Sequence, residues 1–381
     1  MIKTMSKRFI ITIVTLVIIA IAAGAAIFFA KGYTFSTKEK RIVGTGIITI
    51  TSQPDSASVF IDGHLTTATN ATISSLAPKD YSIKVVKEGF IPWEKQVSVK
   101  EGLVSELKIT LFPAIPTIYP LTFNGVSNPV LSPDETKFAY IVAGANLTGS
   151  AAKKAGVWIW TMSNNQPIAF TRSSEPHQIA TNSIADFSKA ALRWSADSKQ
   201  ILATVGENNY LLDADKLNEN PKDITPMLSA TLKSWEDDKK VKDELSIQSI
   251  KDAKFKKIAS DSAFLRWSPD ATRFMARLPD GQAKKDTSLD IRVYDLDEGK
   301  DYLLPSAKFY NWLPDSKHII LIEEKSISLV DFDGSNKAVI YAGSFLDDFV
   351  VPWPDSSRLV IVSSFPTPTA SEPNLYGINL R

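Results

Sequence analysis

The sequence predicts a mainly β protein in which an N-terminal apolar helix precedes two β-rich units. Three observations support this prediction. Residues 9–30 contain no charged residue, residues 46–113 hold five short stretches in which apolar and polar residues alternate, and residues 116–381 repeat one corner motif. Alternation with a period of two is typical of strands with one buried face, and a repeat of this length is typical of an array of similar sheets.

The repeated motif is an aromatic or apolar residue, Ser, Pro and Asp, followed by an apolar strand. Pro fixes its own φ near the turn value, and Ser and Asp side chains hydrogen-bond nearby backbone amides. The copies are Leu131-Ser132-Pro133-Asp134, Trp194-Ser195-Ala196-Asp197, Trp267-Ser268-Pro269-Asp270, Trp312-Leu313-Pro314-Asp315 and Trp353-Pro354-Asp355. Their aspartates are 63, 73, 45 and 40 residues apart. The two shortest intervals match a four-stranded propeller blade of about 40–50 residues.

We therefore predict that residues 116–381 form a β-propeller of about five blades. The longer intervals would be blades with insertions, although a degenerate sixth blade could lie within the 73-residue interval. The first blade is expected to include a strand at 168–171. The last blade is one strand short, and residues 118–122, just before the first blade, are expected to supply it. Joining the two ends in one sheet would close the ring and leave no unpaired terminal blade.

Residues 226–255 break the strand pattern within the propeller. Leu228, Leu232 and Trp235 fall near one helical stripe, with charged residues opposite. This spacing predicts a helical insertion on one face of the ring. A solvent-facing embellishment is favoured over a helix that docks a partner, because the charges are mixed.

Residues 46–113 are predicted to form a small β-sandwich, because the alternating stretches need a buried face. Its first turn is Pro54-Asp55-Ser56-Ala57, followed by Val59-Phe60-Ile61-Asp62-Gly63. Ser56 must reach the turn conformation without the freedom of glycine. Trp93, after Pro92, is a candidate for docking the sandwich onto the propeller.

Two family resemblances rest on these motifs. Residues 46–113 resemble the PEGA domain, an extracytoplasmic β-sandwich module named for its Pro-Glu-Gly-Ala turn, here Pro54-Asp55-Ser56-Ala57. The corner repeats of residues 116–381 resemble the WD-like propeller repeats of TolB-type bacterial envelope proteins. Together they imply a membrane-anchored, surface-exposed bacterial protein.

Residues 9–30 are predicted to be a transmembrane helix, since 22 uncharged residues span about 33 Å as a helix. A cleaved signal peptide is the alternative, because residues 20–26 are rich in small side chains. We favour the uncleaved anchor because the apolar run continues through Ile27, Phe28 and Phe29. Residues 1–8 would be a cytoplasmic tail, residues 31–45 a linker, and the bulk of the chain would lie outside a single-pass cell membrane.

The sequence predicts no catalytic, cofactor-binding or metal-binding residues. It has no cysteine, and its three histidines, His64, His177 and His318, lie on three separate units. Residues 331–335 resemble the start of a calcium loop, but position 342 is Ala where a bidentate Glu is needed, so a hairpin turn is favoured. The corner aspartates could be imagined as a ring of metal ligands, but their recurrence favours backbone capping.

Two classes of function remain. The favoured one is a non-catalytic binding or scaffold protein that presents its propeller to a protein, peptide or cell-wall polymer. The alternative is a propeller-type hydrolase or lyase that acts on envelope peptide or glycan. Trp158 and Trp160, which alternate in one strand, are expected either to pack between blades or to form an aromatic platform for a ligand. The charges nearly cancel, at 43 basic and 42 acidic residues, so nucleic acid is not an expected partner.

Overall fold

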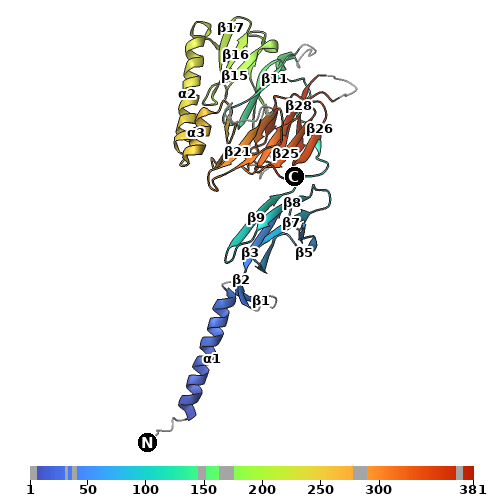
Figure 1. The fold of residues 1–381 in the computed structure, drawn as a ribbon. Coiled ribbons are helices and arrows are strands. Elements are labelled where there is room, and N and C mark those ends of the chain that lie inside the picture. The colour runs from blue at the N-terminus through green and yellow to red at the C-terminus, as the bar shows by residue number, and fades with distance from the viewer. Residues whose placement is uncertain are drawn as a thin grey trace. The chain divides into compact units, whose positions relative to one another are not determined.

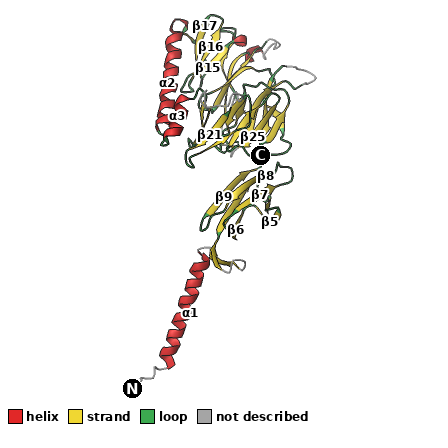
Figure 2. Ribbon diagram, in the orientation of Figure 1, coloured by secondary structure: helices red, strands yellow, loops and turns green. Residues whose placement is uncertain are grey.

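A computed structural model of the chain describes residues 7–30, 33–36, 41–144, 152–162, 176–277, 290–365 and 372–381. The chain divides into two compact units, Met1–Ala114 and Ile115–Arg381. Both are built mainly of strands, and Figure 2 shows helices in red at the N-terminus and beside the sheets of the second unit. The predicted strand at 168–171 lies outside the described residues.

The first unit begins with helix α1 (Lys7–Ala30), whose described side chains are those of residues 11–26. Within the described part of the chain, no helix combines the length and the hydropathy that crossing a membrane requires. Residues 31–45, predicted to be a linker, contain the antiparallel strands β1 (Tyr33–Ser36) and β2 (Arg41–Gly44).

Residues 46–110 form the predicted sandwich, from seven strands where the sequence indicated five. They are β3 (Gly46–Gln53), β4 (Ser58–Ile61), β5 (His64–Ala68), β6 (Ala71–Leu76), β7 (Asp80–Val86), β8 (Trp93–Ser98) and β9 (Val104–Thr110). One sheet has the order β6-β3-β9 and the other β5-β4-β7-β8. Alternate residues, such as Ile48 and Ile50 on β3 and Ile83 and Val85 on β7, are fully buried in a shared core. Ser56 has a φ of 55°, so it does adopt the left-handed conformation expected at its turn.

The described residues of the second unit form five four-stranded antiparallel sheets, which we call blades 1 to 5. Their strands are β11 (Ser127–Leu131), β12 (Lys137–Val142), β13 (Gly156–Thr161) and β14 (His177–Thr181) in blade 1; β15 (Ala191–Trp194), β16 (Gln200–Val205), β17 (Asn208–Asp213) and β18 (Lys222–Asp223) in blade 2; β19 (Leu265–Trp267), β20 (Arg273–Arg277), β21 (Ile291–Asp295) and β22 (Lys300–Leu303) in blade 3; β23 (Phe309–Trp312), β24 (His318–Ile322), β25 (Ser326–Asp331) and β26 (Ala338–Ala342) in blade 4. Blade 5 has the order β10-β29-β28-β27, from β10 (Ile118–Pro120), β27 (Val350–Pro352), β28 (Arg358–Ser363) and β29 (Asn374–Asn379). The predicted closure is confirmed, because Ile118 on β10 pairs with Ile378 on β29.

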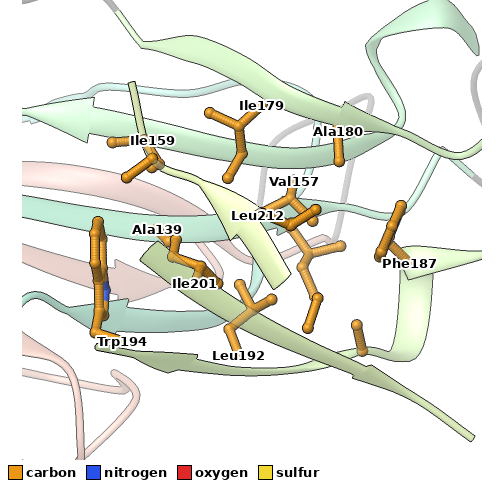
Figure 3. Packing of buried hydrophobic residues seen from close by; sticks show 14 residues of the cluster. Ala139, Val157, Ile159, Ile179, Ala180, Phe187, Leu192, Trp194, Ile201 and Leu212 are labelled. Carbon is orange, nitrogen blue, oxygen red and sulfur yellow. The ribbon is translucent and has the colours of Figure 1, made fainter. Parts of the chain in front are cut away.

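Neighbouring blades pack through apolar cores. Figure 3 shows the core between blades 1 and 2, where Ile159 and Val157 meet Ile201, Leu212 and Trp194. A second core joins blades 5 and 1, and a third joins blades 3 and 4. Tyr341 of blade 4 meets Phe365, which comes after the second strand of blade 5, in an edge-to-face contact. Every blade therefore has neighbours, as a propeller requires.

Helices occupy the junction between blades 2 and 3. The short 3-10 turn Thr225–Met227 leads into α2 (Leu228–Gln248), and α3 (Ala253–Asp261) comes next. Phe255 and Ile258 of α3 pack on the face of blade 3 that carries Phe274 and Tyr294, opposite the face turned to blade 4. On the other side, Arg193 of blade 2 lies 3.9 Å from Glu236 of α2. Figure 1 shows both helices along this flank of the blades.

The predicted insertion is thus present, but it extends to Asp261 and not to 255. It also resolves the question of a hidden sixth blade. The additional residues of the 73-residue interval form the helical insertion, which contacts blades 2 and 3, and they form no further sheet. The second unit also has two further 3-10 turns, Ala152–Lys154 and Phe187–Lys189. In the first unit, an isolated antiparallel bridge joins Phe90 and Pro113.

Candidate interaction surface at the inner rim of the ring

The corner aspartates cap the backbone of their own turns, as the sequence predicted. In each of the five corners, one carboxylate oxygen accepts a hydrogen bond from the backbone N–H two residues later. The donors are Thr136, Lys199, Thr272, Lys317 and Ser357, at 2.9–3.1 Å. The carboxylates are therefore held in separate turns, and the described residues include no group of three or more His, Cys, Asp or Glu side chains that could hold a metal ion.

The corners also join neighbouring blades, which sequence reasoning did not anticipate. The Asp134 N–H of blade 1 donates to Ser198 Oγ of blade 2 at 3.1 Å, and the Asp270 N–H of blade 3 donates to Ser316 Oγ of blade 4 at 3.1 Å. The residue after each corner Asp has a positive φ of 57–60°, in the left-handed region. A repeated Ser one position after the Asp is the signal that could have indicated these links.

The tryptophans of the motif make a second set of links. Trp194 Nε1 donates to the carbonyl of Val130 at 3.0 Å, and Trp312 Nε1 donates to that of Arg266 at 3.2 Å. Both bonds join the first strands of adjacent blades. The first strands therefore converge, so they lie on the inner side of the ring. Trp267, at the junction with the helices, packs into the core there, but its Nε1 has no hydrogen-bond acceptor among the described residues.

One corner departs from the rest at the inner rim. Glu135 occupies the position that holds Ser198, Ala271, Ser316 or Ser356 in the other corners, and its φ is 57°. Its side chain is partly buried, yet no hydrogen bond or ion pair of the Glu135 carboxylate occurs among the described residues. Burial raises the pKa of Glu135 above its usual value, the positive charge of Arg266 opposes that rise, and the neighbouring carboxylate of Asp134 adds to it.

Arg266, whose charge opposes the rise of the Glu135 pKa, lies on β19 of blade 3. The guanidinium is held locally, because Nη1 donates to Asn311 Oδ1 of blade 4 at 3.3 Å and the group lies 5.8 Å from the centre of the Phe264 ring.

The three histidines are not brought together. His64 is exposed on β5, with Nδ1 3.0 Å from the carbonyl oxygen of Asp62, and His177 on β14 has Nε2 3.0 Å from the carbonyl oxygen of Ala214. His318 is buried in blade 4, with Nδ1 2.6 Å from Asp315 and Nε2 3.5 Å from Asp331. It therefore connects the fourth corner to the end of β25, a structural position inside one blade.

The other sequence candidates are also structural. Trp158 and Trp160 face the same side, as expected, and both pack in the core between blades 5 and 1, which favours blade packing over an open aromatic platform. The turn at 331–335 is a hairpin turn between β25 and β26, with Gly334 at a φ of 82°. Trp93 was predicted to dock the sandwich onto the propeller, and this prediction was wrong. It begins β8 with its side chain 8% exposed in the sandwich core, because the alternation of that strand points it inward.

Comparison with known proteins identifies the first β unit. Residues 45–115 match the PEGA domain family, so the chain contains a PEGA domain. Among curated proteins, no match was found.

Solved structures similar to the chain include TolB from Acinetobacter baumannii, at 14% identity and a TM-score of 0.24 over 79% of this chain. That alignment spans 60% of the TolB chain. An oligogalacturonate lyase from Vibrio parahaemolyticus aligns at 9% identity and a TM-score of 0.27, over 92% of this chain and 96% of the lyase. The propeller assignment rests on the strand pairing described above.

Proposed function

We propose that the protein is a membrane-anchored, extracytoplasmic binding or scaffold protein that presents its propeller to a protein, peptide or cell-wall polymer. The observation that carries this proposal is the use of the corner motif. All five repeated aspartates cap their own turns, and two corners also link blades, so the repeat builds a rigid ring. A rigid ring that carries non-repeated loops and helices is suited to holding a partner.

The anchor is part of the proposal. The helical conformation of Lys7–Ala30 and the absence of charge in residues 9–30 support a segment that crosses the bilayer once. The PEGA domain that comes next in the chain supports an extracytoplasmic position for both β units. The short basic tail, with Lys3, Lys7 and Arg8, supports a cytoplasmic N-terminus.

Topology is tested by protease treatment of intact cells that express the chain with one epitope at each end. We expect loss of the C-terminal epitope and protection of the N-terminal one. Lysed cells, in which both epitopes are accessible, provide the control. Protection of the C-terminal epitope in intact cells would refute the proposed orientation.

Binding is tested by capture from envelope extract with the full-length chain in detergent. We expect a specific partner that a PEGA-domain protein without this propeller does not retain. In parallel, the chain is assayed for turnover of ester, peptide and glycan libraries. Turnover that Glu135→Gln abolishes would replace the scaffold with an enzyme that uses the rim carboxyl.

A further inference from the structure

In every blade, the first residue of the second strand lies opposite the last residue of the third strand. In blade 3 these residues are Arg273 and Asp295, and Arg273 Nε lies 2.7 Å from the carboxylate. In blade 4 a histidine and an aspartate occupy the same two positions. Blade 5 keeps a basic residue, Arg358, but the residue opposite is the neutral Asn379. Its guanidinium therefore lacks the carboxylate that blades 3 and 4 supply at this place.

The Arg358 guanidinium is nevertheless held in one orientation. Its Nη1 donates to Tyr119 Oη at 2.8 Å, and the group lies 4.6 Å from the centre of the Trp353 ring. Tyr119 reaches it from β10 across β29, which requires Gly377, because a Cβ there would come within 2.6 Å of a tyrosine ring carbon. Among the described residues, no carboxylate lies within 4.0 Å of the Arg358 guanidinium. The positive charge is therefore positioned but not paired.

Three polar groups at this place have no hydrogen-bond partner among the described residues. They are Arg358 Nε and Ser357 Oγ, both buried, and the side-chain amide of Asn379. Buried polar groups are normally hydrogen-bonded, and an unpaired buried group costs free energy. In blade 3 the equivalent Nε donates to Asp295, and Thr272 Oγ1, equivalent to Ser357 Oγ, accepts from the same guanidinium at 3.2 Å. An oxyanion in the place of the Asp295 carboxylate would accept from Arg358 Nε in blade 5.

We infer that Arg358 binds the carboxylate of an aspartate or glutamate side chain from a protein partner, with Asn379 and Ser357 as further donors. The inference rests on the proposed function and deepens it, since it names the chemistry by which the propeller holds its partner. The planar guanidinium presents Nε and Nη2 side by side, which matches the two oxygens of a carboxylate. Among the described residues, Nη2 makes no hydrogen bond.

The surroundings favour an acidic side chain over other carboxylates. Because Arg358 Nε is buried and the residue as a whole is only partly exposed, the carboxylate must reach it on a narrow arm. An Asp or Glu side chain provides that arm, whereas a uronic acid carries its carboxylate directly on the sugar ring. A second positive charge belongs to the same corner, since Arg381 Nη2 donates to the carbonyl of Asp355 at 2.9 Å. Both guanidinium groups favour an anionic ligand.

The test uses the full-length chain in detergent and the probe acetyl-Gly-Glu-Gly-amide, with the glutamine analogue as the uncharged control. Binding is measured by saturation-transfer NMR titration at pH 7.5. We expect saturable binding of the glutamate peptide and at least tenfold weaker binding of the glutamine peptide, because a charge-assisted hydrogen bond is lost. Glucuronate and inorganic phosphate form two further arms and should also bind more weakly. Equal binding of the two peptides, or tighter binding of glucuronate or phosphate, would overturn the inference.

Two variants and one control complete the design. Asn379→Asp gives blade 5 the aspartate that blades 3 and 4 have at this place, so the fold should be kept while the new carboxylate competes with the ligand for Arg358. Arg358→Gln removes the charge. Both should weaken binding of the glutamate peptide at least tenfold. Lys317→Gln removes an exposed positive charge near the corner of blade 4 and should leave binding unchanged. Full affinity in Asn379→Asp, or an equal loss in Lys317→Gln, would refute the assignment.

The same variants separate this inference from the proposed function. If Asn379→Asp captures the envelope partner as well as the unaltered chain does, the inference about Arg358 fails and the scaffold proposal stands. If the glutamate peptide binds but no partner is captured, the Arg358 site stands and the scaffold proposal fails.

Discussion

The ion pair between Arg273 and Asp295 offers a quantitative test of what holds blades 3 and 4 together. Asp295 is fully buried at the end of β21, and one of its carboxylate oxygens lies 2.7 Å from Arg273 Nε. Its other oxygen accepts from the backbone N–H groups of Asp297 and Glu298, at 3.0 and 2.8 Å. The Arg273 guanidinium also lies 4.0 Å from the centre of the Phe332 ring in blade 4. Through the Arg273 guanidinium, the ion pair therefore connects the interior of blade 3 to blade 4.

Asp295→Asn keeps an oxygen for the two N–H groups and removes only the charge opposite Arg273. Breaking a buried pair in this way costs about 3–5 kcal/mol. We expect the lower end, about 3 kcal/mol, because the backbone contacts survive. For a domain of this size about 1 kcal/mol lowers Tm by roughly 2–4 °C, so Tm should fall by about 6–12 °C. The measurement is thermal unfolding of the full-length chain followed by circular dichroism.

The control is the pair of Arg292 and Asp301, at 2.6 Å but with side chains 27% and 29% exposed. Solvent-accessible pairs contribute about 0–1 kcal/mol, so Asp301→Asn should lower Tm by less than about 4 °C. The double variant Arg273→Met with Asp295→Leu should recover part of the loss, since no buried charge is left unpaired. Equal shifts for Asp295→Asn and Asp301→Asn would refute this reasoning.

Three further predictions concern the corners. Trp312→Phe should cost about 1 kcal/mol more than Trp267→Phe in urea unfolding, because only the first leaves a carbonyl without its indole donor; similar losses would contradict the proposed links between blades. Ser198→Ala should cost about 1–3 kcal/mol by leaving the preceding blade's N–H unpaired, and Ser356→Ala less, since its Oγ has no hydrogen bond among the described residues. Glu135→Ser should stabilise the chain at pH 7 but not near pH 4. Burial places the folded pKa of Glu135 above its unfolded value of 4.5, so stability is lost as pH rises through that window; an equal effect at both pH values would contradict this.

Strands that bury apolar side chains could be predicted from the sequence. Strands that bury few apolar side chains could not. β28 and β24 are continuous apolar runs after their corners and are easily recognised. Strands β5 and β6 were missed because their residues are mostly Thr, Ser and Ala with little burial, so no alternation marks them. The closing strand β10 was found because the last blade was visibly incomplete.

Glu135 shows the limit of reasoning from a repeat. The corner Asp was recognised by its recurrence, whereas Glu135 is informative because it breaks the pattern one position later. Comparing the position after each Asp would have singled it out.

The shared sheet of blade 5 has a consequence for how the protein is made. β10 emerges from the ribosome long before β29, the strand with which it pairs, and no nearer strand replaces that partner among the described residues. Pairing across so long a stretch of chain is slow. If the chain is exported as proposed, β10 stays on the far side of the membrane without its partner until β29 arrives, and blade 5 is completed only then.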